Sequence, residues 1–446
     1  MALPHPPRPR SIPLVGQALA FQRDPLTLFV SLARAYGDVA GFQLGPLPAC
    51  LINHPDYVHR ILVTEARAFP KPRFLHMIAG KFLGKGLVTS EGEEWRRQRK
   101  LIQPAFHHQR LAGYADTMVE FAARLGDSWR PGEQIDMDRA MRALTMEIVA
   151  KTLFNASAGA QAERVYQSAE VFQEMLASAN PLVPSWLPTA HNRREAAAVH
   201  TLDEIVLGFI AEHRAAGSDA GDMLAMLLDA RDEQGNAMSD RQIRDEAVTL
   251  FVAGHETTSS VLAWAWYVLA TQPEVAAALR AELDAVLAGR APAVADLARL
   301  TYTDLFVKEV LRLYPPAWQS QREAAADVDF GEYRVKKGTT IFFSPYLMHR
   351  DPRWWDSPET FRPERFAEAN KASLRPHAYL PFGAGARMCI GQQFAMMESK
   401  LIIAALAQRY EFAVAPNARI AVKHAATLAT EAGMPMIVRP RGAGQV

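Results

Sequence analysis

The sequence predicts a mainly α-helical protein with small β-sheets, and three observations lead to this fold class. Apolar residues recur at helical spacing through most of the 446 residues. Segments with strand-like alternation are few and short. One helical pattern is far longer than the rest. Because 49% of the residues are hydrophobic, the chain can bury a large core, and we expect a single domain over residues 1–446 with this long helix at its centre.

The N-terminal segment is the first element, and it is expected to be an extended arm. Prolines stand at positions 4, 6, 7, 9 and 13, and proline removes the backbone donor that a helix interior needs. We assign residues 1–20 to this proline-rich arm. It contains no secretory signal pattern, and no stretch of about 18 apolar residues follows elsewhere. These features predict a soluble, cytoplasmic protein.

Helices are expected wherever apolar residues repeat every three to four positions. These stretches are 25–35, 92–125, 136–155, 161–178, 195–214, 240–271, 273–288, 302–313 and 392–408.

Two β-hairpins are expected between the helices. Val39–Leu44 and Cys50–Asn53 would form the first. Tyr333–Val335 and Thr339–Phe343, joined by a Lys-Lys-Gly turn, would form the second.

The longest expected helix has clear start and stop signals. Ser239 and Gln242 form a capping-box pattern, and Pro273 ends the pattern. The helix would hold about 32 residues and run for about 48 Å, whereas helices average about 11–12 residues. We therefore expect it to cross the whole domain.

The middle of this helix, Ala-Gly-His-Glu-Thr-Thr, is unusual for a core segment. Gly254 weakens a helix by about 1 kcal/mol relative to alanine, and hydroxyls such as that of Thr257 can bond to the preceding turn and bend the helix. One interpretation is a kinked core helix with a solvated Glu256. The other is a groove in which a small molecule meets an acid and an alcohol.

Charge and cysteine content exclude several classes of protein. Lys+Arg is 49 and Asp+Glu is 48, so the basic excess of a nucleic-acid binder is absent. The chain has only two cysteines, which cannot build a disulfide framework. Cys50, in an apolar hairpin, is expected to be a buried structural thiol.

Cys389 lies in the glycine-rich stretch PFGAGARMCIG and allows three interpretations. It could be a buried structural thiol. It could be the nucleophile of a cysteine hydrolase, although no local signature of such an enzyme surrounds it. It could also be a thiolate ligand to a metal.

The surroundings of Cys389 favour the metal thiolate. The glycines allow backbone N–H groups to approach a thiolate closely, and the expected helix 392–408 would present its positive end to the sulfur. No second cysteine lies near enough to complete a structural zinc site. A single thiolate suits haem iron, which takes four ligands from the macrocycle.

At this point the chain resembles the cytochrome P450 family. Phe382-x-x-Gly385-x-Arg387-x-Cys389-x-Gly391 matches the haem-binding signature of that family. Further P450-like motifs follow the family's order along the chain. They are Trp95-x-x-x-Arg99, Ala253-Gly254-x-Glu256-Thr257-Thr258, Glu309-x-x-Arg312 and Pro363-Glu364-Arg365-Phe366.

The resemblance implies the cytochrome P450 fold, with the long central helix over haem b, and it implies roles for individual residues. Cys389 would be the proximal iron ligand, with Phe382 shielding the sulfur from water and Gly391 allowing close approach of the backbone. Carboxylate-binding groups would hold the haem propionates, and Glu309, Arg312, Arg365 and His349 would form a buried scaffold. The propionate partners would be Trp95, Arg99, Arg322 and Arg387.

The resemblance also implies a distal side. Thr257 and Glu256 would be the catalytic pair that delivers protons. Pro70–Val88 would form the roof of the pocket, and Phe172–Pro188, with Leu182, Val183 and Trp186, the lid. Apolar pockets bind apolar ligands, so a terpenoid, fatty acid or steroid-like substrate is expected. The substrate-contacting residues would be Leu250, Ala253, Thr257, Ala317 and Trp318, with Ala253 also beside the haem.

The expected activity is that of a monomeric, O2-dependent monooxygenase with a separate electron donor. That donor would be a ferredoxin or flavodoxin with its NAD(P)H-dependent reductase. The basic run Arg96, Arg97, Arg99 and Lys100 is a candidate docking surface. Alternatives are a peroxygenase or isomerase of the same family and a haem protein without turnover.

Overall fold

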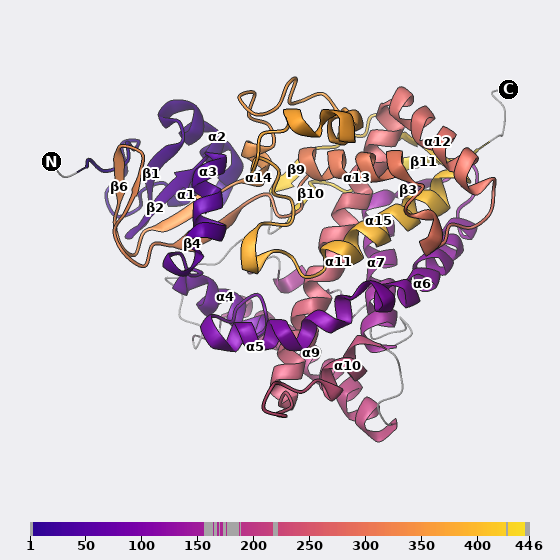
Figure 1. The fold of residues 1–446 in the computed structure, drawn as a ribbon, viewed down its shortest axis with the longest axis horizontal. Helices are drawn as coiled ribbons and strands as arrows, with labels where there is room; N and C mark the ends of the chain where they lie inside the picture. The colour runs from indigo at the N-terminus through magenta and orange to yellow at the C-terminus, as the bar shows by residue number, and fades with distance from the viewer. Residues whose placement is uncertain are drawn as a thin grey trace. The chain divides into compact units, whose positions relative to one another are not determined.

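The computed structural model describes residues 3–155, 189–216, 222–424 and 427–441, together with residues 164, 167, 168, 170–172, 175 and 187. Contacts divide the chain into two compact units. The β-rich unit comprises Met1–Met77, Leu311–Cys389 and Ala426–Leu428. The helical unit comprises Ile78–Val310, Ile390–Ala425 and Ala429–Val446. The expected mixture of many helices with small sheets is confirmed (Figure 1), whereas the single domain stays a prediction.

The β-rich unit is built on a four-stranded sheet with the order β1-β2-β7-β4. The first predicted hairpin is confirmed: β1 (Val39–Leu44) pairs antiparallel with β2 (Leu47–Ile52). Gly45 has a φ of +62° in the two-residue turn, a conformation that glycine adopts without strain.

The second predicted hairpin is wrong. Instead, β6 (Tyr333–Val335) pairs with β5 (Val328–Phe330), and Gly331, with a φ of +59°, turns the chain between them. The strand predicted as its partner, β7 (Thr340–Phe343), is buried at every position. It lies inside the main sheet, parallel to β2 and antiparallel to β4 (Ser320–Glu323). A strand buried on both faces gains more from neighbours on both edges than from a single hairpin partner.

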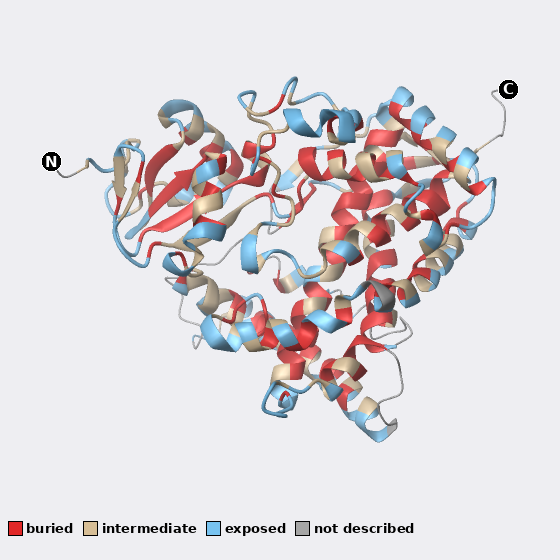
Figure 2. Ribbon diagram, in the orientation of Figure 1, coloured by how far each residue is buried: buried red, intermediate tan, exposed pale blue. Residues whose placement is uncertain are grey.

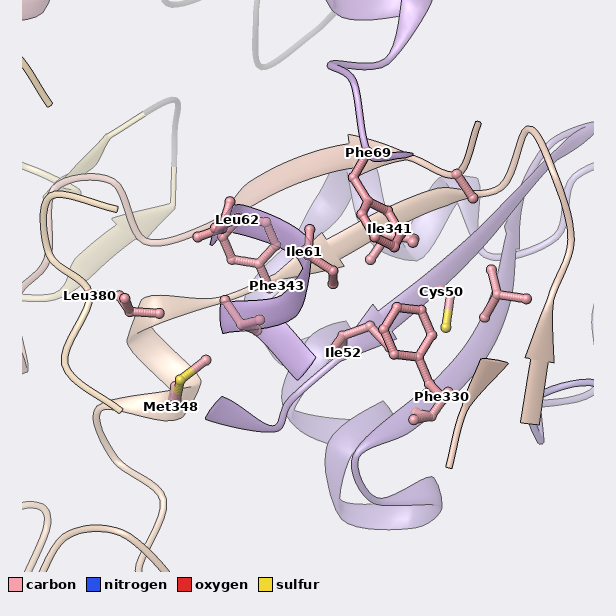
Figure 3. Close-up of a cluster of buried hydrophobic side chains, with 14 residues drawn as sticks. Cys50, Ile52, Ile61, Leu62, Phe69, Phe330, Ile341, Phe343, Met348 and Leu380 are labelled. Carbon is pink, nitrogen blue, oxygen red and sulfur yellow. The ribbon is translucent and has the colours of Figure 1, made fainter. Parts of the chain in front are cut away.

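A cluster of buried apolar side chains packs against this sheet (Figure 3). Cys50 lies within it, close to Ile52 and Phe330. Burial raises the pKa of the Cys50 thiol to about 12, so the thiol stays protonated and unreactive. The prediction that Cys50 is structural is confirmed.

The proline-rich arm lies along this sheet. The Gly41 N–H donates to the Pro7 carbonyl at 2.8 Å, and the Arg334 N–H donates to the Pro4 carbonyl at 2.8 Å. The arm was predicted to reach residue 20, but helix α1 begins at Ala18. The helices of this unit include α1 (Ala18–Arg23), α2 (Pro25–Tyr36), α3 (Pro55–His59) and α14 (Pro345–Met348).

The helical unit contains most of the predicted helices. The pattern over 92–125 forms two helices rather than one, α5 (Gly92–Ile102) and α6 (His108–Asp127), with a 3-10 turn at Gln103–Phe106. Pro104 accounts for the break, because proline cannot continue a helix interior. The predicted helix 161–178 falls mostly outside the described residues. The other helices are α7 (Met137–Phe154), α9 (Ala190–Ala216), α10 (Met223–Asp229), α12 (Pro273–Leu287) and α15 (Gln392–Ala407).

Two helices run across the boundary between the units, α4 (Arg73–Leu83) and α13 (Thr301–Leu313). Small sheets complete the fold. One has the order β3-β11-β8, formed by Gln134–Asp136, Pro435–Pro440 and Tyr410–Val414, and the other pairs β9 (Val422–His424) with β10 (Leu428–Thr430).

The long central helix is α11 (Asp240–Thr271), and its bounds match the prediction. Its capping box is present, with the Ser239 side chain bound to the Gln242 N–H and the Gln242 side chain bound to the Ser239 N–H. Most of its residues are buried (Figure 2), so packing on several sides stabilises its unusual length. Among the described residues, no helix combines the length and the apolar character that crossing a membrane requires.

Candidate functional site

The loop that carries Cys389 is held by its own backbone. The Cys389 N–H donates to the Phe382 carbonyl at 2.9 Å, which closes the glycine-rich segment into a compact turn. Cys389 is exposed, so the interpretation as a buried structural thiol is wrong. The residue stands three positions before α15, whose N-cap is Gly391. The loop therefore presents one accessible thiol just ahead of a helix start.

Gly385 explains part of the glycine pattern in this loop. Its φ is +69°, and a Cβ at this position would lie 2.3 Å from the Leu62 carbonyl oxygen. No other residue fits both the backbone conformation and the space. Gly383 has a similar φ of +70°, but a Cβ there would meet nothing within 4 Å. The loop thus packs backbone to backbone on the segment Arg60–Thr64.

His349 belongs to the predicted scaffold and connects two segments of the β-rich unit. Its Nε2 accepts from the Leu380 N–H at 2.9 Å. The proton must then sit on Nδ1, which donates to the Arg312 carbonyl at 3.1 Å. Burial lowers the pKa of His349 to about 3, so the ring stays neutral. Through Leu380, this histidine supports the chain that leads into the cysteine loop.

The predicted arginine pair of the scaffold meets at one backbone carbonyl. Arg312 and Arg365 both donate to the Thr360 carbonyl, at 3.2 Å and 2.9 Å. Arg312 also donates to the carbonyls of His349 and Pro358. Glu309 lies three residues before Arg312 on α13 and is fully buried. These residues are buried and their arginines hold backbone segments together, which fits the prediction that they form a structural scaffold.

In the helical unit, α11 has an accessible stripe in the middle of its buried length. The stripe consists of Leu250, Ala253, Gly254 and Thr257, and Ala253 is exposed while the other three are partly exposed. The spacing i, i+3, i+4, i+7 places all four on one helix face. These side chains are small or apolar, which suits a hydrophobic ligand.

Glu256 lies beside this stripe but is buried, with 6% of its surface exposed. The interpretation of a solvated glutamate is therefore wrong. Burial raises the pKa of Glu256 to about 7, although Arg142 acts in the opposite direction. The Arg142 Nη1 lies 3.4 Å from Glu256 Oε1, and its Nε lies 3.0 Å from Asp138 Oδ2. The carboxyl is thus poised to gain or lose a proton near neutral pH.

Arg142 and Asp138 were missed by the sequence analysis. Both stand on α7, more than one hundred residues before Glu256, and no motif marks them. The packing of α7 on α11 brings them together, and the Thr145 hydroxyl strengthens that packing by donating to the His255 carbonyl at 2.9 Å. Only the folded helix pair could reveal this group.

The Thr257 hydroxyl donates to the Ala253 carbonyl at 2.8 Å, and Thr258 donates to Gly254 at 3.1 Å. Both bonds follow the prediction that these hydroxyls turn back onto the helix. Each leaves the hydroxyl oxygen able to accept a further hydrogen bond. Because Thr257 is on the accessible stripe, its oxygen is the polar atom that a ligand there would meet.

The predicted propionate partners are distributed over both units. Trp95 and Arg99 stand one turn apart on α5 and are partly exposed. Arg322 is on β4 and Arg387 is in the cysteine loop, and both are partly exposed. Phe382 is partly exposed at the start of that loop. All five side chains are accessible, as binding to a cofactor requires.

Of the two residues predicted before β4 to contact substrate, only Ala317 is exposed. Trp318 is 2% exposed, and its ring centroid lies 6.0 Å from that of Phe29 on α2. Its ring therefore packs in the core of the β-rich unit, which does not favour a contact with substrate, and the assignment of Trp318 as a substrate contact stays a prediction. The lid residues Leu182, Val183 and Trp186 lie outside the described residues.

The predicted basic docking surface on α5 is largely neutralised by internal acids. Arg97 Nε lies 2.6 Å from Asp232, and Lys100 Nζ lies 2.8 Å from Glu233. Arg96 pairs with Glu93 on its own helix. These contacts fasten α5 to the turn after α10, so the run carries less net charge than its sequence indicates.

Comparison with known proteins decides the family. The sequence model for cytochrome P450 matches residues 6–433. The chain belongs to the cytochrome P450 family. The crystal structure of the cytochrome P450DA heme domain is similar to this P450 over 99% of both chains, with a TM-score of 0.90 and 27% identity.

Curated relatives of this P450 from Streptomyces include two proteins named as oxygenases and one named as a synthase. Cyclooctatin synthase of Streptomyces melanosporofaciens is 38% identical over 98% of this chain and 96% of its own length. Cyclooctat-9-en-7-ol 5-monooxygenase of the same species is 38% identical, with 92% and 90% covered. Pentalenene oxygenase of Streptomyces avermitilis is 34% identical, with 92% of each covered. The protein is therefore an oxidoreductase that incorporates oxygen from O2.

The residues present fit the haem b that this family binds. Among the described residues, no group of three or more His, Cys, Asp or Glu side chains could hold a metal ion. Haem iron needs only one protein ligand, and the accessible Cys389 provides one. P450 monooxygenases take electrons from redox partners and act on hydrophobic substrates, for which the stripe on α11 is suited.

Proposed function

We propose that this P450 oxygenates a terpenoid, with the substrate over the accessible stripe of α11. Three relatives that cover more than nine-tenths of the chain support this substrate class, since their names describe oxygenation of cyclooctat-9-en-7-ol, formation of cyclooctatin and oxygenation of pentalenene. The observation that carries the proposal is the stripe itself. It offers Leu250, Ala253 and Gly254 as a smooth apolar face, with Thr257 as its one hydroxyl.

The proposal assigns the cysteine loop to haem binding. When bound, haem supplies the iron at which O2 is activated for transfer of one oxygen atom to carbon. Cys389 would hold the iron through its thiolate, with Phe382 beside the sulfur and Gly391 keeping the backbone close. Arginine forks and the indole N–H suit the propionates. The groups proposed for them are Trp95, Arg99, Arg322 and Arg387.

On the distal side, the proposal gives Thr257 and Glu256 separate tasks. The Thr257 oxygen can accept a hydrogen bond from a water molecule while its own O–H donates to the Ala253 carbonyl. Glu256, with a pKa raised to about 7, can pass protons from the interior of the helical unit toward that water. Arg142 would hold the carboxyl in place between deliveries. Leu250, Ala253 and Ala317 would contact the substrate.

Electrons would come from a separate ferredoxin or flavodoxin, reduced by an NAD(P)H-dependent reductase. The basic residues of α5 support this only in part, because Asp232, Glu233 and Glu93 already neutralise three of them. We therefore expect the apparent KM for an acidic ferredoxin to rise only weakly with ionic strength, by less than about threefold between 50 and 200 mM salt. A steep dependence would show that these cations are free to bind the partner.

The substrate class is tested by ligand titration of the ferric protein. Cyclic terpene hydrocarbons and terpene alcohols should displace water from the iron and shift the visible spectrum, and turnover should yield a product heavier by one oxygen. Leu250→Phe, which narrows the stripe, should weaken binding. Leu207→Phe is the matched control, because Leu207 is an exposed leucine on α9.

Two results would contradict the proposal. One is the absence of any spectral response to the terpenoid panel, with fatty acids or steroids bound in their place. The other is equal terpenoid binding by the Leu250→Phe variant and the wild type, since the substrate would then lie elsewhere.

A further inference from the structure

Three consecutive side chains near the start of α11 bind the segment Phe82–Leu87. The Arg244 Nη1 donates to the Phe82 carbonyl at 3.0 Å. Asp245 Oδ2 accepts from the Lys85 N–H at 2.8 Å, and Glu246 Oε2 accepts from the Leu87 N–H at 2.9 Å. We call Arg244, Asp245 and Glu246 together the clamp. A fourth bond adds to it, from Gln98 Nε2 on α5 to the Lys85 carbonyl at 2.7 Å.

Two glycines let the segment lie directly on α11. Gly84 has a φ of +56°, and a Cβ there would lie 2.1 Å from Asp245 Oδ1. A Cβ at Gly86 would lie 2.1 Å from Thr249 Oγ1 and 2.6 Å from the Asp245 carbonyl oxygen. The backbone of the segment therefore lies directly against the Asp245 and Thr249 side chains of α11, with no side chain of its own at either glycine.

The position of this contact along α11 gives the clamp its importance. Glu246, which accepts from the Leu87 N–H, lies four residues before Leu250, so it stands one turn before the accessible stripe on the same helix face. The clamped segment is thus bound at the N-terminal end of the stripe. If the segment moved away from Thr249, this end of the stripe would open.

Glu246 is the member of the clamp in the least polar surroundings. It is fully buried, and its Oε1 has no hydrogen-bond partner among the described residues. Burial raises the pKa of Glu246 to about 8, the hydrogen bond from the Leu87 N–H acts in the opposite direction, and the neighbouring charges of Asp245 and Glu94 raise the pKa further. The cations nearby are already engaged, Arg244 with Asp203 and Asp245, and Lys85 with Glu94 at 3.9 Å.

We propose that Glu246 is a positioning residue that fixes the segment Gly84–Leu87 against α11 and thereby sets the affinity for the substrate. It takes no part in the chemistry, because its carboxyl binds the backbone amide of Leu87 and not the stripe. The proposal rests on the proposed function for the identity of the ligand. The clamp itself is independent of that identity, since it is a contact within the protein.

The chemistry of the clamp predicts a dependence on pH. At neutral pH the uncharged acid accepts from Leu87 without placing a charge in the buried site. As the pH rises above about 8, Glu246 ionises next to Asp245, and a buried charge of this kind is relieved when water enters. The segment should then leave α11, and the N-terminal end of the stripe should open.

The test combines ligand titration with amide hydrogen exchange on the haem-loaded protein, from pH 6.5 to 9. Glu246→Ala should raise the Kd for the terpenoid about three- to tenfold, the effect of losing one such hydrogen bond, with kcat little changed. Protection of the Leu87 amide should fall in parallel. Glu246→Gln keeps an acceptor oxygen and cannot ionise, so it should restore wild-type affinity at pH 7 and keep it at pH 9.

A control variant and a second measurement make each outcome decisive. Glu274→Gln changes an exposed acid on α12 and should match the wild type throughout. If Glu246→Ala does not fold, the wild type and Glu246→Gln still decide, through the ratio of their Kd values at pH 9. The proposal is overturned if the wild type and Glu246→Gln lose terpenoid affinity equally above pH 8. It is also overturned if protection of the Leu87 amide is unchanged in Glu246→Ala.

Failure of the proposed function is distinguishable from failure of the clamp. If no terpenoid binds, the substrate class is wrong, but amide exchange at Lys85 and Leu87 still reports the clamp and its pH dependence. If terpenoids bind and amide exchange at Leu87 is the same in Glu246→Ala as in the wild type, only the proposed role of Glu246 is wrong.

Discussion

Glu256 and Thr257 are neighbours in sequence but lie in different surroundings. Glu256 is buried against α7 with Arg142, whereas Thr257 belongs to the accessible stripe. A helix places successive residues about 100° apart, so one side chain reaches the interior while the next faces the ligand. This arrangement places the Glu256 carboxyl, which can gain or lose a proton, next to the helix face where substrate is proposed to bind.

Thr257→Ala tests the proposed role of the hydroxyl. The variant should fold and retain haem, because only the hydroxyl that bonds to Ala253 is lost. Product formed per NAD(P)H consumed should fall by at least about tenfold, the usual scale of a lost proton-transfer group. The measurement is the ratio of product to cofactor oxidised. An unchanged ratio would remove Thr257 from the catalytic pair.

Arg142→Gln tests the electrostatic control of Glu256. Arg142 lowers the pKa of Glu256, which burial otherwise raises. Without the guanidinium, the pKa of Glu256 should rise further above 7. The inflection in a plot of kcat against pH should move upward by the same amount.

A matched control for Arg142→Gln is Arg124→Gln, which breaks an exposed pair with Glu147. That variant should leave the inflection in place. Identical profiles for the wild type and Arg142→Gln would mean that Glu256 does not govern the rate.

Residue identities were predictable where a motif marks them. Local sequence motifs mark Cys389, Thr257, Glu256 and the arginines of the scaffold, and the roles of these residues stay proposals. Arg142 could not be predicted, since only the contact of α7 with α11 brings it to Glu256. The burial of Trp318 could not be predicted either, because the sequence does not show which face of an extended segment points to the core.

The cysteine loop is the element whose shape depends most on glycine. Gly385 and Gly383 share a left-handed φ, but only Gly385 lies against another segment, at Leu62. Substitutions at these two positions therefore separate two effects of an added side chain, which are backbone strain and steric collision.

Gly385→Ala should lower stability and haem retention more than Gly383→Ala. Both variants incur the strain of a non-glycine residue at positive φ, about 1–2 kcal/mol. Gly385→Ala adds a Cβ that would lie 2.3 Å from the Leu62 carbonyl oxygen, so the loop must move. Thermal unfolding and the ratio of haem to protein are the measurements. Equal effects of the two substitutions would show that the contact with Leu62 is not needed.

Helices were predicted more reliably than strands for a physical reason. The start and stop of α11 are local signals, a capping box and a proline, and both its bounds were correct. Strand partners are set by segments distant in sequence, such as β2 and β7, which lie side by side although more than 280 residues separate Cys50 from Ile341. The hairpin expected from local turn residues therefore failed.

At the scale of the whole molecule, several buried acids make stability depend on pH. Burial raises the pKa of Glu246 to about 8, of Glu256 to about 7 and of Glu398 to about 8. Burial also lowers the pKa of His255 to about 4 and of His349 to about 3. These histidines weaken the fold only as the pH falls below about 6.5, the ordinary value for the unfolded chain.

The free energy of unfolding should therefore fall between pH 6.5 and 8. In this window the folded chain keeps protons that the unfolded chain has released, so rising pH favours unfolding, by up to about 1.4 kcal/mol per pH unit for each buried acid. Urea unfolding of the haem-free chain at several pH values measures the slope. Glu398→Gln should reduce it, and Glu274→Gln should not. Stability that rises across this window would contradict the burial of these carboxyls.

The central proposal is that the Cys389 thiolate is the protein ligand to the haem iron, and the spectrum of the reduced carbon monoxide complex tests it most directly. We expect the red-shifted band of a thiolate-bound haem in the wild type and its loss in Cys389→Ala, while Cys50→Ala keeps it. A band at the position given by an imidazole ligand, or a thiolate-type band that persists in Cys389→Ala, would contradict this ligation.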